Sequence, residues 1–112
     1  MKRDYENWEY DDFFVFLLIH AAMADFVIQD EEKDIILQLI SKDEFKEFKK
    51  FHDRNNDYEN IQVIMNTKER LGITKQDKDK IFDGIKTIFF ADGEYNLNER
   101  IMNYAFELLF RA

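Results

Sequence analysis

Apolar residues recur with helical spacing along most of this chain. Between residues 81 and 89 they stand at Ile81, Phe82, Ile85, Ile88 and Phe89, the spacing of one face of an α-helix. The pattern predicts helices over residues 8–24, 31–40, 42–53 and 97–110, with two more between residues 56 and 91. The residues that it places toward the core include Leu39, Met65, Ile101 and Leu108. The first of these helices is apolar nearly all round, which is typical of a helix in the middle of a bundle.

Helix starts are marked by pairs of polar residues three positions apart, in which each side chain satisfies the free backbone N–H of the other. The pairs are Ser41 with Glu44, Asn56 with Glu59 and Thr74 with Asp77. Gly72 directly follows Leu71, where a left-handed residue typically ends a helix. Gly84, within a helix, predicts a close helix crossing.

One segment occurs twice in related form. Residues 21–33 read AAMADFVIQDEEK and residues 88–100 read IFFADGEYNLNER, so that aligning Asp25 with Asp92 places Glu32 on Glu99. Apolar positions also correspond, namely Leu18 with Ile85, Ala22 with Phe89, Ile28 with Tyr95, Ile35 with Met102, and Leu39 with Phe106. We therefore expect an all-α fold: a single compact bundle of about six helices, built from two similar helical hairpins joined by two connecting helices.

Composition supports a single domain over residues 1–112. The chain is 46% hydrophobic, well above the level at which disorder is expected, and it holds no proline and three glycines, which favours helices with short connections. It has no cysteine, which excludes disulfides, thiolate metal sites and cysteine nucleophiles.

Charge narrows the classes of partner. The net charge of −8 repels phosphate backbones, so we expect no nucleic-acid partner. The acidic N-terminus is unlike a secretory signal, and the longest apolar run, residues 13–19, is far shorter than the roughly 20 residues of a membrane span. We expect a soluble, cytoplasmic protein. Lys46, Lys49 and Lys50 form one basic helix face, either solvated or a docking patch for an acidic partner or an anionic membrane surface.

The duplicated loops carry the candidate chemistry. Asp92, Gly93, Tyr95 and Glu99 match the last eight positions of an EF-hand calcium loop, whereas the two earlier ligand positions are apolar. One loop offers two carboxylates, but calcium takes about six to eight oxygens. If the loops lie side by side, Asp25, Glu32, Asp92 and Glu99 would converge on one divalent cation, Ca, Mg or Mn.

Helix capping explains the same residues without a metal. Glu32 follows Gln29 by three positions and Glu99 follows Asn96 by three, the arrangement of a capping acid at the positive end of a helix dipole. The two aspartates would then bond the N–H groups of their own loops. Both interpretations stay open, and one does not exclude the other.

The segments AMADFVIQDEE and FADGEYNLNE resemble the paired A-D-G-x-I-x-x-x-E loops of the TerB-like family, named for the tellurite-resistance protein TerB. This resemblance implies a compact all-helical bacterial domain in the cytoplasm that serves stress responses as a binding or scaffolding component. It also implies that the four acidic positions are candidate cation ligands. Phe26 departs from the family pattern, because it stands where the motif has glycine, as Gly93 does in the second loop.

The leading functional hypothesis is thus a small TerB-like binding module. The alternative is a metal-independent interaction or regulatory domain that docks a partner on exposed aromatic side chains or on the face of Lys46, Lys49 and Lys50. Trp8 and Tyr10 are expected to be exposed, and they either cover a neighbour or fold back. We expect a monomer or a homodimer.

We do not expect an enzyme, because the single serine, Ser41, is a helix cap; a metal-dependent hydrolase is the third hypothesis. His20 is interpreted as a hydrogen-bonded core or boundary residue rather than a ligand or base.

Overall fold

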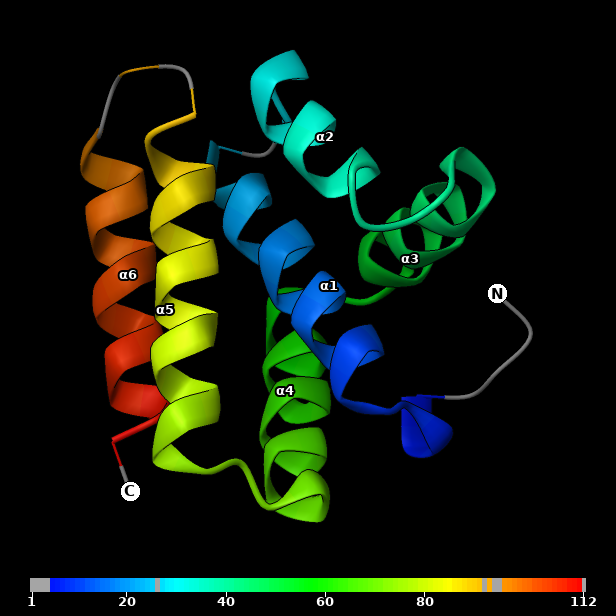
Figure 1. Cartoon of the computed structure of the whole chain (residues 1–112), viewed down its shortest axis with the longest axis vertical. Coiled ribbons are helices and arrows are strands. Elements are labelled where there is room, and N and C mark those ends of the chain that lie inside the picture. Colours follow the sequence, from blue (N-terminus) through cyan, green and yellow to red (C-terminus); the bar gives the residue numbers. More distant parts are fainter. Residues whose placement is uncertain (1–4, 26, 92, 94–95, 112) are drawn as a thin grey trace.

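The computed structural model describes residues 5–25, 27–91, 93 and 96–111 of the chain. Six α-helices and two short 3-10 helices make up this part, and no β-strand occurs in it (Figure 1). The elements are η1 (Tyr5–Asn7), α1 (Tyr10–Ala22), η2 (Met23–Asp25), α2 (Asp30–Leu37), α3 (Lys42–Arg54), α4 (Asp57–Leu71), α5 (Lys75–Phe89) and α6 (Leu97–Leu109). The expected all-α bundle is confirmed.

Helix α1 lies in the middle of the bundle, as its nearly uniform apolar surface predicts. The helices α2, α3, α4, α5 and α6 all pack against it. The side chains from Phe16 to Ala22 are all buried, which is why a single helix can serve five neighbours. In Figure 1 the other helices surround this blue helix.

Residues 5–9, just before α1, fold back onto the bundle. Trp8 is 1% exposed, and its ring centroid lies 5.0 Å from that of Phe16 and 5.5 Å from those of Phe48 and Phe51. Arg70 of α4 donates from Nη2 to the Trp8 carbonyl oxygen at 2.6 Å. Trp8 is therefore a core residue that joins η1 to α1 and α3.

The predicted helix caps are present. The side-chain oxygen accepts the backbone N–H three residues on at 3.1 Å for Ser41, 2.8 Å for Asn56 and 3.1 Å for Thr74. Gly72 ends α4 in the left-handed conformation, with φ of 63°. These signals depend only on neighbours in sequence, which is why they can be recognised without the tertiary structure.

Gly84 marks a close crossing of α5 and α1. A Cβ atom at this position would lie 2.7 Å from the ring of Phe14 and 3.2 Å from Leu18, closer than side-chain atoms normally approach. The absence of a side chain is therefore what allows α1 and α5 to pack at this distance.

Several residues expected to face inward are exposed. Leu39 is 53% exposed because α2 ends at Leu37, so this residue belongs to the turn before α3 rather than to a helix face. Met65 of α4 is also exposed. On α6, Phe106 is buried, whereas Ile101 and Leu108 point away from it.

In the described segments of the chain, no helix combines the length and apolar character that crossing a bilayer would require.

Candidate functional site

Glu32 stands in the first turn of α2, where it caps the helix. Its Oε1 accepts the backbone N–H of Gln29 at 2.9 Å, and the side chain is buried at 6% exposure. The carboxylate thus lies at the positive end of the helix dipole. This bond is the one that the spacing of Gln29 and Glu32 predicts.

Glu99 repeats this arrangement at the start of α6. Its Oε1 accepts the backbone N–H of Asn96 at 3.1 Å, while Asn96 Oδ1 accepts the backbone N–H of Glu99 at 2.9 Å. Glu99 is buried at 4% exposure. The two duplicated loops therefore end in the same way, with a buried glutamate hydrogen-bonded to the N-cap of the following helix.

The segments that flank the two loops lie at the same end of the bundle. The short helix η2, which leads into the first loop, packs against α6, which follows the second. In Figure 1 the C-terminal ends of α1 and α5 and the N-terminal end of α6 all point toward the top of the view. Glu32 and Glu99 thus belong to helices that start at the same end of the molecule.

Asp25 and Asp92, the other two predicted ligands, fall outside what can be described. The backbone of Asp25 closes η2, but its side chain and the whole of Asp92 lie outside the described residues, as does Phe26. Across the described residues, no three histidine, aspartate or glutamate side chains group closely enough to hold a metal ion. Gly93 has φ of 83°, the left-handed conformation that favours glycine in its loop.

A buried pair of histidines joins α1 to α3. His20 Nδ1 lies 2.8 Å from His52 Nε2, and each side chain is 6% exposed. One ring must donate an N–H and the other accept it, so one of these facing nitrogens carries a proton and the other does not. The interpretation of His20 as a hydrogen-bonded core residue agrees with this contact.

Burial keeps both rings neutral. Desolvation, followed by the neighbouring His52, lowers the pKa of His20 from 6.5 to about 4. Desolvation also lowers the pKa of His52, against the opposing effect of Asp53, whose Oδ1 lies 3.9 Å from His52 Nδ1. At neutral pH the pair is an uncharged hydrogen bond within the core.

A buried asparagine extends this polar contact to α4. Asn60, 1% exposed, donates from Nδ2 to the His52 carbonyl oxygen at 3.1 Å, and its Oδ1 accepts from Asn55 Nδ2 at 3.0 Å. The histidines thus take part in a network that holds α1, α3 and α4 together. The sequence pattern does not predict this network. The spacing of His52, four residues after Phe48, does place its side chain on the buried face of α3.

A groove with a volume of about 270 Å³ runs beside the histidine pair. It is lined mainly by α6, through Ile101, Met102 and Ala105 among others, and His20 reaches it from α1. Asn98 and Asp57 are polar residues of its lining. The groove has the mixture of apolar wall and few polar groups that suits binding of an apolar side chain or small molecule.

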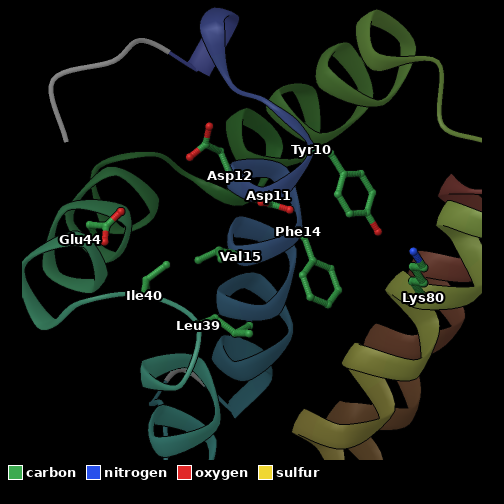
Figure 2. A pocket seen from close by; sticks show the side chains of 9 residues that line it. All are labelled: Tyr10, Asp11, Asp12, Phe14, Val15, Leu39, Ile40, Glu44 and Lys80. Atoms are coloured by element: carbon green, nitrogen blue, oxygen red, sulfur yellow. The ribbon is translucent and has the colours of Figure 1, made fainter.

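A larger cleft, with a volume of about 590 Å³, is lined by the first half of α1, the turn before α3 and Lys80 of α5 (Figure 2). Figure 2 shows Phe14 and Tyr10 on the α1 side and Lys80 on α5. The acidic residues of the lining include Asp12 and Glu44, which accept the backbone N–H groups of Glu9 at 3.0 Å and Ser41 at 3.2 Å. These carboxylates therefore already have structural roles as helix caps.

The basic face predicted on α3 is partly neutralised. Lys49 donates from Nζ to Asp53 Oδ2 at 2.6 Å, one helical turn away, whereas Lys46 and Lys50 are exposed. An exposed ion pair of this kind contributes at most about 1 kcal/mol to stability. It is therefore weak enough for Lys49 to exchange Asp53 for water or for an acidic group of a partner.

Comparisons with protein-family models, with curated proteins and with solved structures gave no match. The likeness of the two loops to the TerB-like pattern therefore stays a prediction that rests on the residues of the loops.

Proposed function

We propose that the chain is a small TerB-like binding module of the cytoplasm that serves a stress response by holding a divalent cation at the loop end of its bundle. The observation that carries this proposal is the matched pair Glu32 and Glu99. Both are buried, both make the same backbone hydrogen bond, and both follow loops whose flanking elements share one end of the molecule.

The chemistry of a buried carboxylate supports this assignment. Removing a charged carboxylate from water is costly unless hydrogen bonds and opposite charge compensate for it. A helix N-terminus supplies part of that compensation, and a cation between the loops would supply more. Asp25 and Asp92 precede these glutamates by seven residues in each copy, so they are the natural further ligands.

Thermal unfolding with and without Ca, Mg, Mn or Zn tests the proposal. A ligand present at a hundred times its dissociation constant stabilises the folded state by about 2.7 kcal/mol. We expect one of these ions to raise the melting temperature of the wild-type chain. We expect no such rise for the double variant Glu32→Gln with Glu99→Gln.

Glutamine suits this test because its side-chain oxygen can still accept the N-cap N–H, so the variant removes charge while it keeps the cap. The matched control is Glu6→Gln with Glu69→Gln, two exposed acids on η1 and α4, away from both loops. The proposal fails if no ion stabilises the wild-type chain, or if the double variant responds as the control does.

A metal-independent interaction module is the second candidate function. The exposed apolar side chains of α6, including Ile101 and Tyr104, favour it. Contiguous apolar surface of this kind marks contact sites for other proteins. Binding that persists in a chelator would separate this function from cation binding.

A further inference from the structure

Four large apolar side chains follow one another along the outer surface of α6. Leu97, Ile101, Tyr104 and Leu108 are 70%, 59%, 58% and 46% exposed, and we call them the α6 stripe. Their spacing of four, three and four residues is that of the seam of a coiled coil. α6 therefore carries apolar residues on two faces, of which only the one around Phe106 is buried in the bundle.

The position of α6 leaves the stripe open. Phe106 packs its ring against His20 at 5.8 Å between centroids, and the helix rests on α1 and η2. Figure 1 shows α6 at one edge of the molecule. The groove beside it shares Ile101 with the stripe and is lined by the small residue Ala105, which lets another helix approach closely.

The residues that flank the stripe fit a second copy of the same helix running in the opposite direction. A two-fold axis between Ile101 and Tyr104 places Ile101 against Tyr104 of the other copy and Leu97 against Leu108. Arg100 and Glu107, both exposed, flank the seam on one side, seven residues apart. Antiparallel pairing brings Arg100 of each copy next to Glu107 of the other, so that two charge pairs form.

The residues on the opposite side of the seam are also compatible with antiparallel pairing. On that side Asn98 meets Ala105 of the second copy, so no charge is buried. A parallel arrangement would instead set Arg100 against Ala105, and it would leave Glu107 without a cation beside it. Charge complementarity therefore selects the antiparallel arrangement.

We propose that the chain forms a two-fold symmetric homodimer in which the α6 stripes of two copies pack antiparallel. Such an interface is isologous, because the same surface serves both copies. The stripe is about 17 Å long, which makes a small contact, so we expect a dissociation constant of about 1 to 100 µM. The proposal goes beyond cation binding and does not depend on it.

Sedimentation equilibrium of the full chain in a chelator, from about 5 to 500 µM, tests the interface. We expect the average mass to rise from that of a monomer toward that of a dimer. Ile101→Lys and Tyr104→Lys should each weaken the association by about 100-fold, because each places two charges in the apolar seam. The matched control is Tyr58→Lys, a substitution at a residue that is 70% exposed on α4, and it should associate as the wild type does.

Charge exchange tests the orientation. Arg100→Glu or Glu107→Arg alone sets like charges together twice per dimer, so each should weaken association by about tenfold. An equimolar mixture of the two single variants pairs opposite charges at both places and should recover the wild-type association. If each substitution weakened association only by disturbing the fold of its own chain, mixing the two variants would not restore association.

The proposal is overturned if the wild-type chain stays monomeric over the whole range, which would assign the stripe to a different partner. A mass above that of a dimer would replace the closed two-fold contact with an open assembly. Equal association of Ile101→Lys, Tyr104→Lys and Tyr58→Lys would place the interface elsewhere, and failure of the mixture to recover would exclude the antiparallel orientation.

Discussion

The hydrogen bond between His20 and His52 is a polar contact inside an apolar core. It joins α1 to α3 across 32 positions of sequence, with 2.8 Å between His20 Nδ1 and His52 Nε2. One of the two facing nitrogens donates its N–H and the other accepts it, so a proton on the accepting nitrogen would break the bond. The stability of this part of the core therefore depends on pH.

The histidine pair predicts acid sensitivity. The pKa of His20 is about 4 in the folded chain, below the ordinary 6.5, so between these values the unfolded chain binds more protons. The free energy of unfolding therefore does not depend on this group above pH 6.5. As the pH falls from 6.5 toward 4, proton binding by the unfolded chain lowers the free energy of unfolding, by on the order of 3 kcal/mol in all.

Nuclear magnetic resonance titration of the two imidazoles, the only ones in the chain, measures these values directly. Urea unfolding over the same pH range should show stability falling with acidity more steeply for the wild type than for His20→Gln, which cannot titrate at this position. A His20 signal that titrates near 6.5 in the folded chain would contradict the assignment of a desolvated, neutral ring.

At the scale of elements, helix starts were predictable because they are local. Thr74 illustrates this, since its Oγ1 accepts the backbone N–H of Asp77 and the Asp77 carboxylate accepts that of Thr74 at 3.0 Å. Hydrogen bonds to the Asp77 carboxylate from the backbone N–H of Thr74 and, to a smaller extent, from the Thr74 side chain lower the pKa of Asp77. Any chain with this spacing can form the cap, whatever its tertiary fold.

Thr74→Ala should destabilise the chain by about 1 kcal/mol, because it leaves the first turn of α5 without its side-chain acceptor. Thr74→Ser should retain most of the stability. The matched control is Thr87→Ala on the same helix, where the exposed hydroxyl donates only to the Asp83 carbonyl oxygen, and its effect should be near zero or slightly stabilising. Urea unfolding measures all three, and equal losses for Thr74→Ala and Thr87→Ala would refute the role of the cap.

Helix faces were predicted less well than helix starts. The apolar residues of α6 fall on two faces, so periodicity alone cannot tell which one the bundle buries. Phe106 proved to be inside, whereas Ile101 and Leu108, expected inside, are exposed. Which face of α6 is buried depends on how α6 packs against α1 and η2, and this packing is a property of the assembled fold.

For the whole molecule, the sequence repeat correctly predicts a bundle of about six helices. It does not predict that the two halves differ in the length of the helix after each loop. The helix after the first loop, α2, has eight residues, whereas α6 has thirteen. Consequently Leu39 is exposed although its counterpart Phe106 is buried. The correspondence between the halves holds best at the capping glutamates, Glu32 and Glu99, beside the loops.

The candidate site also depends on the whole molecule. The sequence could identify Asp25, Glu32, Asp92 and Glu99 as a matched set, but only the packing of η2 against α6 relates the two loops in space. Two loops that each supply about two carboxylates are a plausible cation site only when they act together. Cooperation between the loops is therefore the central claim for the function of this chain.

Paramagnetic broadening by Mn²⁺ tests this claim most directly, because a bound ion broadens the resonances of nearby amide groups. We predict that one equivalent of Mn²⁺ broadens the amide signals of Gln29 and Asn96 together and with the same titration curve, and that excess Mg²⁺ or Ca²⁺ reverses both effects. Broadening at one loop alone, at neither loop, or equally in the variant with Glu32→Gln and Glu99→Gln would contradict a shared site.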